Sequence, residues 1–239
     1  MLALDFDGVV CDSVEEAWQS SKACAREHGL PAAPDTPLAR ERFRRLRPLI
    51  TEGADFLLIQ RTLNKSGSPA DDIAAFHELR GGVSADEYAG YRELLAAFRR
   101  ARIRADFSAW VSDHSLYRGI PELLSLLRED ERMIIVSTKQ ADLISAILSH
   151  FSLPLPEHRI HYAGTRAKLT LIQSLASARG LPPGTVLFVD DQPEHFRHDR
   201  NGMLCRLADW GYLPPDWNAD SDPPLISREE LSAVARSLA

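Results

Sequence analysis

The sequence is short of cysteine: three occur among 239 residues, and no two of them form a CxxC pair. An odd number of scattered cysteines argues against a disulfide framework and suits a reducing compartment. Apolar runs fall well short of the roughly 20 residues that cross a bilayer. The first one starts at Met1 and leaves no room for a signal peptide. We therefore expect a cytoplasmic protein with no membrane partner.

Basic charge is also limited, since 28 Lys and Arg residues face 34 Asp and Glu residues and the formal net charge is −6. This balance argues against a general nucleic-acid binder. The hydrophobic fraction of 44% and the charged fraction of 26% are ordinary for a globular protein. The length allows one large domain or two smaller ones. The oligomeric state is left open.

Three short apolar runs, at residues 1–4, 133–136 and 186–189, each end in polar side chains. Buried parallel strands are typically unbroken apolar runs, and ligands of open α/β sheets bind beyond the carboxyl ends of the strands. We therefore expect these polar side chains to meet at one sheet edge. They are Asp5 and Asp7 after the first run, Ser137 and Thr138 after the second, and Asp190 and Asp191 after the third.

The rest of the chain predicts an α/β fold with a helical insertion. From residue 13 to about 112 the pattern is helical, and from 113 onward strands alternate with helices, which predicts a Rossmann-like parallel sheet. We predict a core of residues 1–12 and 113–239 and an all-helical cap domain at 13–112, placed to close over the sheet edge as a lid. Capping boxes are predicted at Ser13–Glu16, Ser84–Glu87 and Ser227–Glu230. Strands are predicted at 133–137, 160–162, 185–190 and 203–207, helices at 140–151 and 168–179, and irregular surface at 213–224.

The residue types at this edge suit phosphoryl chemistry. Carboxylates so close together need compensation, and Mg²⁺ prefers oxygen ligands together with a substrate phosphate. One carboxylate can act as a nucleophile through an aspartyl-phosphate, and a second can act as general acid and base. Ser137 or Thr138 would supply a hydroxyl donor, and a lysine would neutralise the phosphate charge that the metal leaves over.

Together these motifs resemble the haloacid dehalogenase-like hydrolase superfamily, in its phosphatase branch. The resemblance implies a Mg²⁺-dependent phosphatase that hydrolyses a small phosphorylated metabolite. Members that dehalogenate or cleave phosphonates lack the second aspartate of the first motif, which Asp7 provides here. The implied roles are Asp5 as nucleophile, Asp7 as general acid/base, Ser137, Thr138 and Lys168 as phosphate-binding residues, and Asp5, Asp7, Asp190 and Asp191 as metal ligands.

The fourth motif departs from the family pattern. The family often has an acidic residue four positions after the metal ligand, and His195 stands there if that ligand is Asp191. Either Glu194 substitutes, or the surroundings of the metal differ, or Asp190 and Asp191 share the task. We favour Asp191 as the direct ligand.

Two other functions are compatible with the motifs: a phosphomutase or phosphotransferase of the same family, and a non-catalytic binding or regulatory protein. For the latter the contact surface would be the basic segment 40–47. We interpret that segment as an amphipathic helix with Phe43, Leu46 and Ile50 packed inward. An alternative is that one of its arginines reaches an anionic part of the substrate.

Several further residues are interpreted as structural or secondary. His195 and His198 are expected on a solvated helix face, and the 210–212 segment is expected to close the last strand. Lys139 would bind substrate or orient Asp5, and Arg166 is a possible replacement for Lys168. The aromatic stripe is expected to form the core of the cap; it consists of Tyr88, Tyr91 and Phe98.

Overall fold

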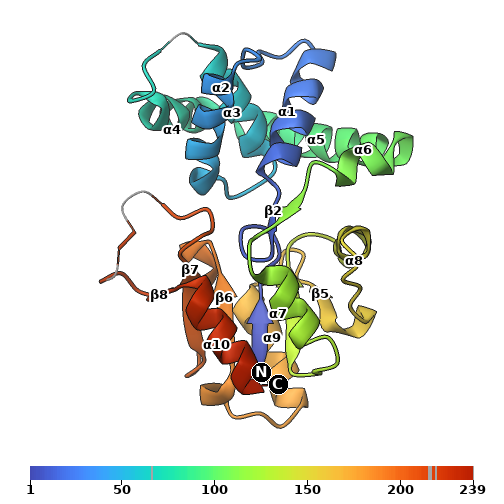
Figure 1. Ribbon diagram of the computed structural model, residues 1–239. Coiled ribbons are helices and arrows are strands. Elements are labelled where there is room, and N and C mark those ends of the chain that lie inside the picture. Colours follow the sequence, from blue (N-terminus) through green and yellow to red (C-terminus); the bar gives the residue numbers. More distant parts are fainter. Residues whose placement is uncertain (66, 215–216, 219, 239) are drawn as a thin grey trace. The chain divides into compact units, whose positions relative to one another are not determined.

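The computed structural model describes residues 1–65, 67–214, 217–218 and 220–238. The chain divides into two compact units, shown in Figure 1. The first comprises Met1–Asp12 and Ser115–Ala239, and the second comprises Ser13–His114. No helix among the described residues is long and apolar enough to cross a membrane.

The first unit contains a six-stranded parallel sheet, which confirms the predicted fold class. Its central strand β1 pairs on both sides, so that Leu4 lies beside Ile135 of β4 and Val189 of β6. The carboxyl ends of these three strands therefore meet at one edge. In spatial order the strands are β5 (Ile160–Tyr162), β4 (Met133–Ser137), β1 (Leu2–Leu4), β6 (Leu187–Asp190), β7 (Leu204–Ala208) and β8 (Leu225–Ile226).

Helices cover both faces of the sheet. In Figure 1, α7 and α10 lie side by side in front of it and α9 lies behind it. Along each strand alternate residues face opposite sides, and Ala3, Ile134 and Phe188 belong to one buried cluster with Leu169 and Ile172 of α9. The helical elements of this unit are α7 (Ile120–Leu126), α8 (Ala141–His150), η2 (Glu157–Arg159), α9 (Lys168–Ala178), η3 (Pro183–Thr185), η4 (Pro193–Phe196) and α10 (Arg228–Leu238).

A short antiparallel pair marks the places where the chain leaves and re-enters the sheet unit. In this pair, β2 (Cys11–Asp12) lies beside β3 (Ser115–Leu116), with Asp12 opposite Ser115. These two strands and β8 could not be predicted from the sequence, because two residues are too few to show the alternating hydrophobic pattern of a strand. The strands at 133–137 and 160–162 were predicted correctly, whereas β6 begins at 187 and β7 spans 204–208.

Every regular element among the described residues of the second unit is a helix. Phe43, Leu46 and Ile50 are buried, as predicted for the basic segment. Arg42 of this segment forms a buried bidentate pair with Asp72. The elements are α1 (Val14–Glu27), α2 (Pro37–Leu46), η1 (Arg47–Leu49), α3 (Ala54–Asn64), α4 (Asp72–Gly82), α5 (Ala85–Ala105) and α6 (Phe107–Val111).

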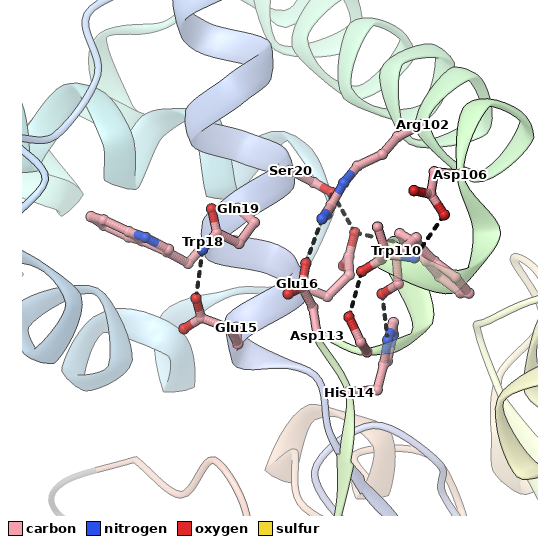
Figure 2. Close-up of polar contacts among 12 residues, drawn as sticks. Glu15, Glu16, Trp18, Gln19, Ser20, Arg102, Asp106, Trp110, Asp113 and His114 are labelled. Carbon is pink, nitrogen blue, oxygen red and sulfur yellow. Dashed lines mark hydrogen bonds and ion pairs between the residues drawn. The ribbon is translucent and has the colours of Figure 1, made fainter. Parts of the chain in front are cut away.

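One predicted capping box is wrong. Ser13 precedes α1 but its side chain makes no cap hydrogen bond. Glu16 instead accepts hydrogen bonds from Arg99, Trp110 and Ser20. Figure 2 shows Glu16 with Ser20 and Trp110 in this polar cluster. A buried carboxylate is stabilised more by a guanidinium than by one backbone N–H. Tertiary contacts therefore override the local cap.

The other two boxes are partly or fully formed. The Ser84 hydroxyl accepts from the backbone N–H of Glu87, but the Glu87 carboxylate bonds Arg61 and Tyr91 rather than reaching back. Ser227 and Glu230 form the reciprocal pair of hydrogen bonds. The predicted irregular stretch 213–224 lies partly outside the described residues; its described part contains neither helix nor strand.

A buried arginine ties β4 to the helix before it. Arg159 has no exposed surface, and its guanidinium donates to the backbone carbonyls of Leu127, Arg128 and Met133. These oxygens have lost their hydration, so each needs a donor.

We predict that Arg159→Met lowers the free energy of unfolding by about 2–4 kcal/mol, because three carbonyls lose their donor while the side-chain volume is largely kept. Urea unfolding followed by circular dichroism measures this. Arg128→Met is the control: its side chain is 57% exposed, and its change should stay within about 0.5 kcal/mol. Equal stability of the two variants would contradict the prediction.

Candidate active site

A buried lysine joins two carboxylates at the carboxyl edge of the sheet. Lys168 Nζ lies 2.8 Å from Asp5 Oδ2 and 2.9 Å from Asp190 Oδ2. Asp5 directly follows β1, Asp190 ends β6 and Lys168 begins α9. All three side chains are nearly inaccessible to solvent. The structure thus brings together three residues that the sequence placed in one site.

Asp190 is fully engaged in this network. Its Oδ2 contacts Lys168 and the Nδ1 of His195, and its Oδ1 accepts from the backbone N–H groups of Asp191 and Gln192. Burial alone would raise the pKa of Asp190, but His195 and Lys168 hold it well below its usual range. Since a carboxylate offers about four acceptor sites, Asp190 is best suited to positioning its neighbours.

Asp5 has one engaged and one unengaged oxygen. Its Oδ2 contacts Lys168, whereas its Oδ1 is buried without a hydrogen-bond partner among the described residues. Burial raises the pKa of Asp5, with Lys168 opposing the rise and Asp190 adding to it. A buried acceptor without a donor is costly. Asp5 Oδ1 is therefore suited to a cation or an electrophile.

Asp7 lies in the turn that follows β1. Lys139 Nζ is 2.9 Å from its Oδ1, so Lys139 pairs with Asp7 and not with Asp5. The side chain of Asp7 is 22% exposed, against 6% for Asp5, and can exchange protons with solvent more readily. The turn requires glycine at position 8, where φ is +89°.

Asp191 is packed between two backbone segments. It is completely buried, and its Oδ2 accepts from the backbone N–H of Tyr212 at 3.2 Å. A Cβ placed on Gly8 would lie 2.2 Å from the same oxygen. The absence of a side chain at position 8 is thus what lets the first turn approach Asp191.

The remaining predicted phosphate-binding residues end β4. Ser137 is buried, and its hydroxyl accepts from the backbone N–H of Lys139. Ser137 lies one strand away from Asp5 across the β1–β4 pairing. Thr138 follows it and is exposed. Arg166, the suggested replacement for Lys168, is exposed and bonds the carbonyl of Tyr162, so it lies outside the ion network.

The expectation of a solvated helix face is wrong for His195. Its side chain is 24% exposed and directed at Asp190, because η4 begins soon after the strand and brings position 195 back to the carboxylate. Glu194 pairs with Arg197 and is 42% exposed, so it takes no part in this network. The sequence offered only a weak indication of this pair, because an aspartate and a histidine five positions apart also occur in many surface turns where they do not interact.

The donor set fits a divalent cation. Asp5, Asp7, Asp190 and Asp191 bring four negative charges and Lys139 and Lys168 bring two positive ones, which leaves two negative charges before His195 is counted. Asp5, Asp190 and His195 offer ligand atoms within 4.8 Å of one another. The ammonium of Lys168 already joins the two carboxylates of that trio. The oxygen of that trio best suited to a cation is therefore Asp5 Oδ1, which has no hydrogen-bond partner among the described residues.

We predict that Lys168→Met lowers the free energy of unfolding by about 3–5 kcal/mol near neutral pH, because two buried carboxylates lose their shared counter-charge. In the wild type the pKa of Asp190 is lowered, so its ionised carboxylate stabilises the fold above the acid range. This stabilisation is lost as pH falls and the carboxylate is protonated. In the variant, burial still raises the pKa of Asp5, and the positive charge of Lys168 no longer opposes that rise. Stability should then fall as pH rises above about 4.

Urea unfolding at about pH 5 and about pH 8 tests both the loss and its sign. Lys139→Met is the matched control, since its partner Asp7 is partly hydrated and the cost should be about 1 kcal/mol. A Lys168→Met variant as stable as Lys139→Met, or more stable at the higher pH, would contradict the prediction.

Comparison with known proteins gives a fold but no close sequence relative. No protein-family model and no curated protein sequence matches the chain. Solved structures match over almost its whole length. A predicted phosphoglycolate phosphatase from Haemophilus somnus is 18% identical with a TM-score of 0.63, covering 100% of this chain and 97% of that one.

Two further structures share the architecture. A haloacid dehalogenase-like hydrolase from Streptococcus pneumoniae is 16% identical, with a TM-score of 0.64 and coverage of 99% and 97%. Protein tyrosine kinase A from Mycobacterium tuberculosis is 21% identical, with a TM-score of 0.54 and coverage of 98% and 97%. The structural neighbours confirm the resemblance indicated by the motifs: this chain has the fold of the haloacid dehalogenase-like hydrolases.

Proposed function

We propose that the protein is a Mg²⁺-dependent phosphatase that hydrolyses a small phosphorylated metabolite through an aspartyl-phosphate on Asp5. The observation that carries the proposal is the buried Asp5–Lys168–Asp190 network, with Asp7 two residues from the nucleophile and Ser137 on the adjoining strand. A structural ion pair would not require an unpartnered carboxylate oxygen beside it. Perturbed, buried titratable groups of this kind are typical of functional sites.

Asp5 attacks phosphorus, forming an oxygen–phosphorus bond while the bond to the leaving alkoxide breaks. Asp7 gives its proton to that alkoxide. It then takes a proton from a water that attacks the phosphoryl group, and the bond to Asp5 breaks to release inorganic phosphate. Lys168 and Ser137 donate to the phosphoryl oxygens as their negative charge rearranges.

The metal would be held by Asp5, Asp7 and Asp191. Asp190, with its acceptor sites engaged, keeps Lys168 and His195 in place instead. When bound, Mg²⁺ supplies charge compensation for the carboxylates and for the phosphate of the substrate. This assignment favours Asp191 over Asp190 as the direct ligand of the fourth motif.

The substrate is proposed from the chemistry and from the neighbours. Several similar structures are described as predicted phosphoglycolate phosphatases, an activity assigned to them without direct proof. Small phosphorylated organic acids therefore come first in a substrate panel. The role of residues 13–112 as a cap domain that selects the substrate, the cytoplasmic location, and the absence of nucleic-acid and membrane partners all stay predictions.

Phosphoryl transfer to another acceptor is the second candidate. The similarity to a structure described as a protein tyrosine kinase favours it, and the same Asp5 chemistry would serve if a hydroxyl replaced water. Isomerised or transferred phosphate in place of free phosphate would identify this activity.

We predict that Asp5→Asn lowers Mg²⁺-dependent phosphate release by about a thousandfold or more, because an amide does not form the acyl-phosphate bond. A phosphate-release screen over phosphorylated metabolites, with Mg²⁺ or with EDTA, measures this. Asp142→Asn, an exposed carboxylate on α8, is the control and keeps full activity. A folded Asp5→Asn variant as active as the wild type would exclude the nucleophile. No turnover of any substrate by the wild type would favour a binding protein.

A further inference from the structure

The turn after β7 makes two hydrogen bonds to the first turn of the site and one to Asp191. We call residues Trp210, Gly211 and Tyr212 the 210–212 turn. The indole Nε1 of Trp210 donates to the carbonyl of Val9 at 3.0 Å, and the hydroxyl of Tyr212 donates to Asp12 Oδ1 at 2.7 Å. The backbone N–H of Tyr212 donates to Asp191 Oδ2. One short turn therefore reaches both the 5–12 segment and Asp191.

Gly211 fits into a space that no side chain could share. A Cβ at this position would lie 2.5 Å from the Cβ of Asp191 and 2.6 Å from the carbonyl oxygen of Gly8. Position 8 is equally restricted, because a Cβ added to Gly8 would clash with Asp191 Oδ2. Asp191 is thus in contact with glycine backbone from two separate chain segments, which together fix its position.

The 5–12 segment has its own internal hydrogen bonds. The N–H of Gly8 bonds the carbonyl of Cys11, and the N–H groups of Val10 and Cys11 bond the carbonyl of Phe6. These bonds give the turn its shape but do not fix it relative to Asp191. The contacts from the 210–212 turn at Val9 and Asp12 do so.

We propose that the 210–212 turn is a positioning element of the metal site, holding Asp191 in register with Asp5 and Asp7 and so setting the affinity for a divalent cation. The inference rests on the proposed function only in taking these three aspartates as ligands. Mg²⁺ demands near-ideal octahedral geometry, so a small displacement of one ligand weakens it. Groups that orient metal ligands typically change affinity by about 10–100-fold when altered.

The alternative is a purely structural role, in which this turn only ends the last strand before it, β7. In that case its substitutions would reduce stability without changing metal affinity per folded molecule. Metal binding measured without substrate separates the two roles.

We predict that Gly211→Ala binds Mg²⁺ about tenfold more weakly than the wild type, because the added methyl displaces Asp191 or the Gly8 carbonyl. Isothermal titration calorimetry with MgCl₂ on the full chain measures this, and urea unfolding gives the folded fraction. Gly184→Ala is the matched control: no atom lies within 4 Å of its added Cβ and its φ is not positive, so its affinity should equal that of the wild type.

Two milder variants serve if Gly211→Ala does not fold. Trp210→Phe and Tyr212→Phe each keep an aromatic ring and lose one hydrogen bond. At least one should weaken Mg²⁺ binding about fivefold, the equivalent of about 1 kcal/mol for one hydrogen bond. Wild-type affinity in every folded variant, or no Mg²⁺ binding by the wild type, would overturn the inference.

Turnover separates this inference from the proposed function. With an active substrate, Gly211→Ala should need more Mg²⁺ for half-maximal rate while KM at saturating Mg²⁺ is unchanged. If the wild type binds Mg²⁺ but hydrolyses nothing, and Gly211→Ala binds it weakly, the phosphatase proposal fails and the positioning role stands. If the wild type hydrolyses a substrate and Gly211→Ala keeps full Mg²⁺ affinity, the phosphatase proposal stands and the positioning role fails.

Discussion

The whole sheet edge depends on one buried ammonium. Lys168 lies between Asp5 and Asp190, which are far apart in the sequence but stand at the ends of neighbouring strands. Without it, the parallel sheet would bring like charges together in a poorly hydrated space, which is among the most unfavourable arrangements in a protein. With it, one carboxylate is fully satisfied and the other keeps an oxygen available for chemistry. The proposed reactivity of Asp5 and the stability of the core thus depend on the same lysine.

Close backbone approach is the second constraint. The backbone of Gly8 and of Gly211 lies close against Asp191, where a side chain would clash, and neither glycine carries chemistry of its own. Their contribution is geometric: they let two turns from different strands reach one carboxylate. The proposed active site therefore depends on absent side chains as well as on charged ones.

Much of this architecture can be predicted from the sequence, and the failures have physical causes. Unbroken apolar runs predict buried parallel strands, and their common direction places Asp5 and Asp190 at one edge without further information. Lys168 follows from its position at a helix start before the last of these strands. By contrast, the capping role predicted for Glu16 is wrong because Arg99, far along the chain, competes for that carboxylate. The pairing of His195 depends on the path of one short turn, which no periodicity encodes.

The antiparallel pair formed by β2 and β3 has a consequence for how such a chain can change. Asp12 and Ser115 are paired neighbours, so the roughly one hundred residues between them begin and end at adjacent positions of the first unit. A segment with adjacent ends can be lengthened, shortened or exchanged without altering the register of the sheet. Changes in the length or sequence of the inserted helices therefore need not disturb the sheet edge that carries Asp5 and Asp190.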